Sequence, residues 1–172
     1  MQCPWYTSVN TLRADGFSGF VTIRDLRRCK LDCVPSRRGD IGVYIVLRPE
    51  ADLPVFLERS TGGRFKDRDP NVLQEILTKH WVPGAQIVYI GKAGIPGKSA
   101  TLRSRIGQYL DFGAGRPIGH RGGRFIWHLP SSEELVVCWK PTPEQIPRDV
   151  EQRMIQEFKK AFGVRPFANL RD

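Results

Sequence analysis

One carboxylate lies where an apolar side chain would be expected. The C-terminal segment that ends at Phe162 has the 3.6-residue periodicity of an amphipathic helix, and Glu151 falls at the centre of its apolar face, among Met154, Ile155 and Phe158. A buried, unpaired carboxylate is costly, so Glu151 must be neutralised, paired with an Arg or Lys, or bound to a cation. Its place in the first turn also fits a purely structural contact with the helix N-terminus.

A second candidate is an arginine on a helix that the sequence predicts over residues 101–110. Arg105 and Tyr109 are one turn apart on this helix, beside the apolar Leu102 and Ile106. Arg105 is therefore close to the core-facing side, where a guanidinium could stabilise a charged phosphate. A surface salt bridge is the alternative role for this side chain.

Two predicted strands each combine a tyrosine with a glycine. The first contains Gly42 and Tyr44, and the second contains Tyr89 and Gly91. A glycine in a strand removes a side chain and lets another group approach closely. Tyrosine is ordinary in strands, so neither motif alone indicates a function.

In their order along the chain, these motifs resemble the GIY-YIG nuclease superfamily. The two signatures stand here as Gly42-Val43-Tyr44 and Tyr89-Ile90-Gly91, and the second is followed by Lys92. The arginine-bearing helix, the carboxylate of the C-terminal helix and a Pro-x-x-Asn motif at 166–169 then follow in the family's order. The resemblance covers residues 41–170.

The chain departs from the family pattern in two places. About 40 residues separate the two signatures, whereas many members join them by a short hairpin, and this indicates an elaborated, standalone member of restriction or mobile-element type. The spacing from Glu151 to Asn169 is long. Measured from Glu157 it is closer to that of compact members, so Glu157 stays open as the metal-binding carboxylate.

The resemblance implies a divalent-metal-dependent endonuclease that hydrolyses DNA phosphodiester bonds. Glu151 would be the one protein ligand of Mg²⁺, with Mn²⁺ as an alternative, because such ions keep several waters and accept phosphate oxygens as ligands. Tyr44 would act as general base and Arg105 would hold the attacked phosphate. The implied site also includes Tyr89, Lys92, Tyr109 and Asn169. The alternative function is a non-catalytic nucleic-acid-binding module.

The elements that must position these residues predict an α+β fold, with a small, mainly antiparallel sheet flanked by helices. Residues 1–39 are expected to form an N-terminal arm, with a short helix after a capping box at Thr22, and residues 40–172 the nuclease-like domain. Strands are predicted at 41–47, 86–91, 124–129 and 135–139, with a shorter extended run at 55–57. Helices are predicted at 69–81, at 101–110 and from Glu144 or Pro147 to Phe162, with Gly163 as the C-terminal cap.

Net charge indicates a polyanionic partner. The 172 residues contain 27 Lys and Arg against 18 Asp and Glu, for a net charge of +9. Residues 84–128 hold seven basic side chains and one acidic, so the phosphate contacts are expected there. The expected DNA-binding residues are Arg103, Arg116, His120, Arg121 and Arg124. The alternative is that the positive charge only aids solubility.

The remaining features concern compartment and assembly. The chain has no apolar run long enough to span a bilayer and no signal peptide at its start, so we expect a cytoplasmic protein without a membrane partner. Cys29 and Cys33 form a C-x₃-C pair, but the second pair of a structural zinc site is missing, so reduced thiols are expected. A homodimer is possible, because cutting both strands calls for two sites or two successive nicks.

Overall fold

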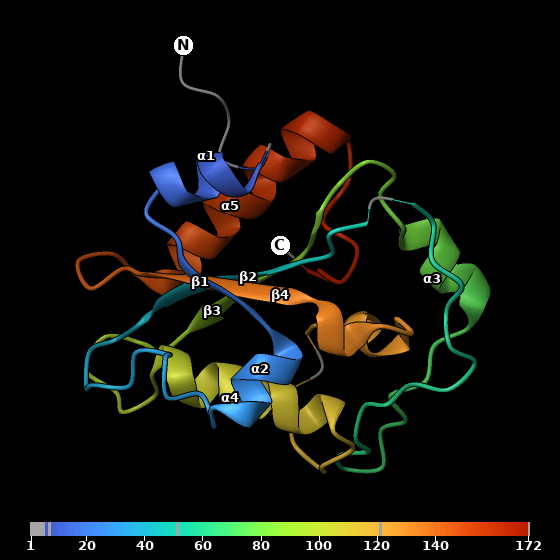
Figure 1. Ribbon diagram of the computed structural model, residues 1–172, viewed down its shortest axis with the longest axis horizontal. Helices are drawn as coiled ribbons and strands as arrows, with labels where there is room; N and C mark the ends of the chain where they lie inside the picture. Colours follow the sequence, from blue (N-terminus) through green and yellow to red (C-terminus); the bar gives the residue numbers. More distant parts are fainter. Residues whose placement is uncertain (1–5, 7, 51, 121, 172) are drawn as a thin grey trace.

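The chain folds around one four-stranded antiparallel sheet flanked by helices, which confirms the predicted α+β class (Figure 1). The structure is a computed structural model and describes residue 6 and residues 8–50, 52–120 and 122–171. The strand order is β1-β4-β2-β3, so β3 and β1 are the edges of the sheet. The strands are β1 (Ser18–Thr22), β2 (Gly42–Leu47), β3 (Ile87–Ala93) and β4 (Val136–Pro141).

Helices cover both faces of the sheet. In Figure 1, α1 and α5 lie on one side of it and α2 and α4 on the other. The α-helices are α1 (Val9–Ala14), α2 (Ile23–Arg28), α3 (Gln74–His80), α4 (Leu102–Gly113) and α5 (Pro147–Phe162). Two 3₁₀ turns, η2 (Arg124–His128) and η3 (Ser132–Glu134), precede β4. No helix in the described ranges is long and apolar enough to cross a membrane.

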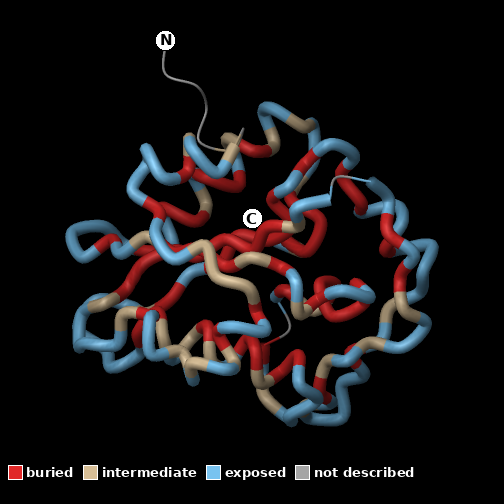
Figure 2. Tube along the Cα trace, in the orientation of Figure 1, coloured by how far each residue is buried: buried red, intermediate tan, exposed pale blue. Residues whose placement is uncertain are grey.

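Strand β2 is buried on both faces, which explains its unbroken apolar sequence. Successive side chains of a strand point to opposite faces. Accordingly, Tyr44 and Val46 belong to the core cluster shared with α2 and α4, while Val43 and Ile45 belong to the cluster shared with α1 and α5. Figure 2 shows this buried layer through the middle of the molecule, with the exposed segments around it.

The two helices that carry candidate residues begin where the sequence predicts, and α5 also ends there, whereas α4 continues three residues beyond the predicted end at residue 110. Thr101 caps α4 through a reciprocal hydrogen-bond pair with Ser104. Helix α5 begins at Pro147, whose missing N–H costs nothing in the first turn, and it stops at Gly163, which adopts a left-handed φ of 76°.

Three predicted elements differ from the observed ones. Residues 124–128 are not a strand but the 3₁₀ turn η2, in which the four consecutive side chains from Phe125 to His128 are all buried instead of alternating between two faces. The run at 55–57 is extended but makes no ladder; its Leu57 N–H donates to the His128 carbonyl, and side chains bond to the carbonyls of Phe56 and Leu57.

The helix predicted from residue 69 begins instead at Gln74, with Leu73 as its N-cap. The Asp69 carboxylate accepts a hydrogen bond from the Asn71 N–H at 2.8 Å, so this Asp closes a local turn rather than capping a helix.

The N-terminal residues contribute to the sheet itself. Strand β1 pairs antiparallel with β4, and Thr22 caps α2 by accepting from the Asp25 N–H at 3.1 Å. Leu12 of α1 joins the core cluster on the α5 side. The division of the chain into an arm and a domain at residues 39 and 40 stays a prediction.

Candidate active site

A cleft of about 720 Å³ opens at the β3 edge of the sheet and collects most of the candidate catalytic residues. Strand β3 contributes Tyr89 and Lys92, helix α4 contributes Arg105, and helix α5 contributes Glu151. Because β3 is an edge strand, elements from both faces of the sheet reach the same opening. Residues that are 62 positions apart in the chain, Tyr89 and Glu151, therefore meet there.

The carboxylate of the cleft is Glu151, which lies on the buried side of α5 as the helical periodicity predicts. Its side chain is 12 % exposed and forms an ion pair with Lys92, whose side chain is 43 % exposed. This contact neutralises the carboxylate, which is one of the three solutions that the sequence left open. Glu157 is only half-buried and does not line the cleft.

The glycine of the second tyrosine motif makes room for the Tyr44 ring, whereas Gly42 lies against the backbone of β4, where a Cβ would clash with the Lys140 carbonyl oxygen. Tyr44 on β2 stands directly opposite Gly91 on β3. A Cβ atom at position 91 would lie 2.5 Å from the Tyr44 ring, so this site accepts no side chain. Tyr89 lies on the same face, and its ring centroid is 5.9 Å from that of Tyr44. The paired motifs thus build one aromatic cluster beneath the cleft.

Tyr44 does not itself line the cleft. Its side chain is fully buried, and its hydroxyl lies 3.1 Å from Nε2 of His120. Burial raises the pKa of Tyr44 well above its ordinary value, and the neighbouring Tyr89 raises it further, while the positive charge of Arg105 opposes both. The hydroxyl is therefore protonated at neutral pH.

His120 is a correction to the expected DNA-binding set. The ring is fully buried, stacks at a tilt on Tyr109 with a centroid distance of 4.9 Å, and points at Tyr44 rather than at solvent. Burial, together with the charge of Arg105, lowers the pKa of His120 to about 3. A neutral, enclosed imidazole cannot contact a DNA backbone from this position.

Tyr89 is the tyrosine that faces the cleft. Burial and then the negative charge of Glu151 raise the pKa of Tyr89 to about 12, against the opposing effect of Arg105. The loop at Gly122 and Gly123 passes close to this ring, since a Cβ at position 122 would lie 3.2 Å from the Tyr89 hydroxyl oxygen. The loop glycines therefore allow the backbone to approach the tyrosine closely.

Arg105 is the cation whose charge acts on the aromatic cluster. Its guanidinium donates to Oε1 of Gln108 at 3.0 Å, and its charge acts on both Tyr44 and Tyr89. Tyr109, one turn further along α4, is fully buried and stacks on Tyr89 with ring centroids 5.6 Å apart. Tyr109 thus supports the cleft from behind.

Asn169 fastens the C-terminal segment to the edge of β3. Its Oδ1 accepts from the Ile90 N–H at 2.9 Å, and its Nδ2 donates to the Ile90 carbonyl at 2.8 Å. The Ala168 N–H adds a bond to the Val88 carbonyl at 2.9 Å. Both polar atoms of the amide are used in this way, so Asn169 orders the site.

The remaining expected DNA-binding residues divide between the cleft and the surface. Arg124 lines the cleft. Arg103 instead pairs with Asp32 at 2.6 Å, and Arg116 pairs with Asp111 at 3.2 Å, both outside the cleft lining. Arg121 lies outside the described residues.

Sequence analysis missed several basic residues of the cleft wall. Arg148 is three positions before Glu151 on α5, so the helical period could have identified it. Arg68 comes from a long loop and Arg171 follows the C-terminal helix, and nothing in their local sequence indicates this cleft. The full basic lining is Arg68, Lys92, Lys98, Arg105, Arg124, Arg148 and Arg171.

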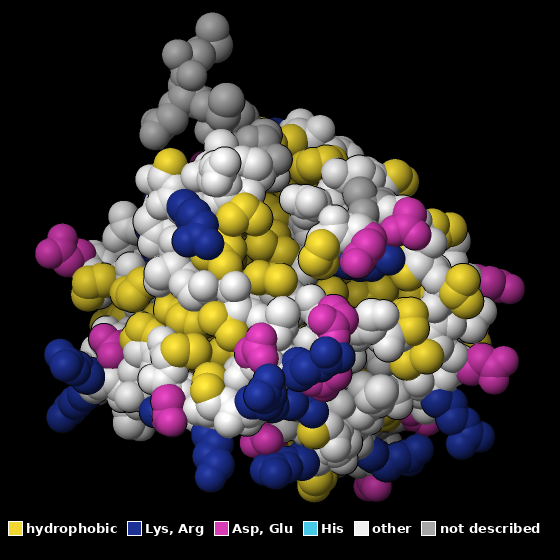
Figure 3. All heavy atoms as spheres, in the orientation of Figure 1, with side chains coloured by type: hydrophobic (Ala, Val, Ile, Leu, Met, Phe, Trp, Pro, Cys, Tyr) yellow, Lys and Arg dark blue, Asp and Glu magenta, His cyan; other side chains and the backbone are white. Residues whose placement is uncertain are grey.

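Part of the positive charge elsewhere on the surface is paired with carboxylates. Figure 3 shows most Lys and Arg side chains of one face in its lower half, where α2 and α4 lie in Figure 1. The arginines of α2 pair with nearby carboxylates: Arg24 with Glu134, Arg27 with Glu133 at 3.4 Å, and Arg28 with Asp25 at 3.6 Å. The cleft differs, because Glu151 is the one carboxylate among the residues that line it.

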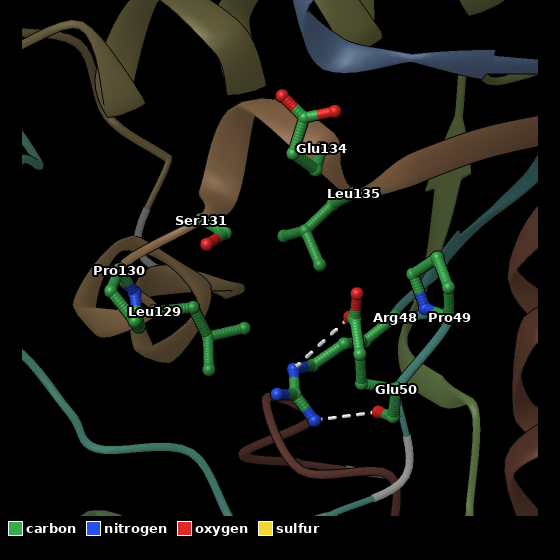
Figure 4. A pocket seen from close by; sticks show the side chains of 8 residues that line it. All are labelled: Arg48, Pro49, Glu50, Leu129, Pro130, Ser131, Glu134 and Leu135. Carbon is green, nitrogen blue, oxygen red and sulfur yellow. Dashed lines mark hydrogen bonds and ion pairs between the residues drawn. The ribbon is translucent and has the colours of Figure 1, made fainter.

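A smaller hollow of about 240 Å³ lies between the end of β2 and the segment 129–135. Figure 4 shows the Arg48 guanidinium directed at Glu50, with which it makes a 2.6 Å hydrogen bond to the carbonyl and a 3.8 Å ion pair. The same guanidinium pairs with Asp52 at 3.2 Å and lies over the Trp81 ring. The two carboxylates neutralise the Arg48 guanidinium, so this hollow is a poor anion-binding site.

No protein-family model matches the chain, and no curated protein or solved structure matches it either. The resemblance to GIY-YIG nucleases therefore rests on the motif residues and their order in the sequence.

Proposed function

We propose that the chain is a divalent-metal-dependent endonuclease that hydrolyses DNA phosphodiester bonds at the β3-edge cleft. The observation that carries this proposal is the charge of that cleft. Seven basic side chains surround one carboxylate and one tyrosine. A polyanion is the ligand that such a lining favours, and the single carboxylate is the group that a nucleic-acid-binding surface would not otherwise need.

Mg²⁺, or Mn²⁺ in its place, fits Glu151 as its protein ligand. The described residues bring no three Asp, Glu, His or Cys side chains together, so a metal at Glu151 relies on phosphate oxygens and water for its other ligands. Such an ion would stabilise charge on the attacked phosphate and the leaving oxygen. Lys92 must release the carboxylate first, because its ammonium already pairs with it. The freed ammonium is then available to a phosphate.

The chain's own residues take different roles from those that the resemblance assigns to the two tyrosines. A general base must come within hydrogen-bond reach of the proton that it removes. Tyr44 is fully buried, whereas Tyr89 lines the cleft. We therefore assign the contact with the attacking water to Tyr89, and to Tyr44 the support of Tyr89 from behind. Arg105 would hold the phosphate.

Cleavage assays with matched variants test this function. Plasmid and mixed genomic DNA are incubated with the protein, with and without Mg²⁺ or Mn²⁺, and the cut ends are mapped. We expect metal-dependent nicking or cutting that is lost in Glu151→Gln and Arg105→Ala and retained in Glu157→Gln. DNA binding without cleavage by the wild-type chain under all metal conditions would refute the enzyme and support the non-catalytic binding module.

Assembly and compartment belong to the same proposal. One cleft cuts one strand at a time, so double-strand cleavage would use a homodimer or two successive nicks. Sedimentation of the protein on a short duplex distinguishes these routes. We place the activity in the cytoplasm, in an enzyme of restriction or mobile-element type.

A further inference from the structure

Two thiols face each other on the surface between α2 and β2. Sγ of Cys29 and Sγ of Cys33 are 3.8 Å apart, and Cys33 is exposed while Cys29 is half-buried. A disulfide needs a sulfur separation of about 2.0 Å, so the two atoms have to close by only about 1.8 Å. Rotation of the exposed Cys33 side chain can supply this movement without unfolding the segment.

The turn between these cysteines holds the two sulfur atoms beside each other. Lys30 and Leu31 adopt left-handed φ values of 49° and 62°, which residues other than glycine rarely take. The Leu31 N–H donates to the Leu26 carbonyl at 3.0 Å, and the Asp32 N–H donates to the Cys29 carbonyl at 2.9 Å. The Cys29 sulfur lies 3.5 Å from the Leu26 carbonyl oxygen and 3.8 Å from the Cys33 sulfur.

The electrostatics of the pair favour one order of attack. Burial raises the pKa of Cys29, but the neighbouring Cys33 thiol and then the backbone of the turn lower it by more, so its pKa lies below the ordinary value. Burial and the neighbouring Cys29 raise the pKa of Cys33. Cys29 is therefore the more reactive thiol and Cys33 the resolving one.

We propose that Cys29 and Cys33 form a reversible dithiol–disulfide site that reacts with small disulfides of the glutathione class. The Cys29 thiolate attacks one sulfur of glutathione disulfide, the S–S bond breaks, and one glutathione thiolate leaves. The Cys33 thiol loses its proton to solvent and attacks the Cys29 sulfur, and the second glutathione leaves. Two protein thiols are oxidised and one glutathione disulfide is reduced to two glutathione molecules.

The same turn holds the start of α4. Arg103 donates to the Lys30 carbonyl at 2.9 Å and to the Asp32 carboxylate at 2.6 Å. Leu31 packs beside Gly107, where an added Cβ would lie 3.2 Å from its Cδ1. Closing the disulfide tethers both ends of this contact, and α4 carries the cleft residue Arg105. The proposal therefore includes slower opening of the first turn of α4 in the oxidised protein.

Mass spectrometry of the full chain after incubation in glutathione redox buffers tests the disulfide. Trypsin cleaves after Lys30 and separates the two cysteines, so a fragment that holds both and lacks two hydrogen masses identifies the bond. We expect this fragment in wild-type protein and in a Cys3→Ser control, its loss on adding dithiothreitol, and its absence in Cys33→Ser. Free thiols, or a stable glutathione adduct on Cys33 alone, under excess glutathione disulfide would overturn the proposal.

Hydrogen exchange then tests the coupling to α4. The amides of residues 102–106 should exchange more slowly in the oxidised wild-type protein than in the reduced protein. Cys33→Ser should show no difference between the two buffers. Equal exchange of oxidised and reduced wild-type protein would overturn the coupling. Neither measurement needs nuclease activity, so the outcome of each is independent of the proposed function.

Discussion

Replacing Glu151 by Gln removes the one carboxylate of the cleft and releases the ammonium of Lys92. The change keeps the size and shape of the side chain. Lys92 is 43 % exposed and regains water when its partner loses the charge, so the lost ion pair costs at most about 1 kcal/mol. For a chain of 172 residues this lowers the melting temperature by no more than about 2–4 °C. The lost desolvation of the carboxylate offsets part of that cost.

DNA affinity should change in the opposite direction. A negative charge leaves a wall of basic side chains, and Lys92 becomes free to neutralise a phosphate. We expect tighter binding of a duplex without metal, and a plot of log K against log salt that is steeper by about 0.9 for the one added phosphate contact. Fluorescence anisotropy over a salt series measures both quantities. Glu157→Gln, off the cleft, should leave affinity and slope unchanged.

The reasoning fails in one measurable way. If Glu151→Gln leaves the affinity and the salt slope as in the wild-type protein, then Lys92 and Glu151 lie outside the DNA footprint and the cleft is not the binding site. A fall in melting temperature well beyond about 4 °C would show instead that the ion pair is a buried element of the fold.

Three further predictions follow from neighbouring residues. Tyr44→Phe leaves the buried Nε2 of His120 without its partner and should destabilise the protein by about 1–3 kcal/mol. Tyr89→Phe should leave stability unchanged and lower the cleavage rate more than Tyr44→Phe does. Denaturant titration and turnover measure these quantities, and a larger loss of stability in Tyr89→Phe with a larger loss of cleavage in Tyr44→Phe would contradict the assignment. The pKa of His120 is about 3 in the folded chain and about 6.5 in the unfolded chain, so only the unfolded state binds the extra proton as pH falls from about 6.5 to 3, and stability falls over that window. His120→Gln should reduce the pH dependence of the unfolding free energy by about one proton, measured by urea unfolding against pH. An unaltered pH dependence would exclude a neutral buried imidazole. Arg124→Ala should weaken DNA binding and reduce the salt slope by about one unit, while Arg116→Ala should not; equal effects of both would place the footprint outside the cleft.

The sequence correctly predicts burial and helix limits where these depend on the spacing of nearby residues. The buried position of Glu151 follows from the spacing of apolar residues on α5, and the confirmed limits of that helix follow from Pro147 and Gly163. The close approach at Gly91 follows from the absence of a side chain there. These features depend on a few neighbouring positions, which is why single-chain reasoning reaches them.

The features that sequence reasoning missed depend on contacts between distant segments. Which tyrosine faces the cleft is decided by the strand order, since β3 is an edge and β2 is covered on both sides. His120 belongs to a basic, glycine-rich segment whose sequence predicts a solvent-exposed loop, but its side chain is buried against the aromatic cluster. Arg68 reaches the cleft from a loop whose own sequence specifies no partner.

The strand order also has a consequence for how the molecule assembles. Strand β1 is made first but pairs only with β4, whose residues follow more than a hundred positions later, and β2 and β3 are made between them. The bonds from Asn169 to Ile90 span a further 79 residues. Contacts of such long sequence separation make folding slow. During synthesis the outer edge of β3 stays unpaired until the segment that carries Asn169 emerges. A growing chain in which β3 has already formed therefore exposes an unpaired strand edge to other chains. High expression levels should favour aggregation of such chains over completion of the cleft.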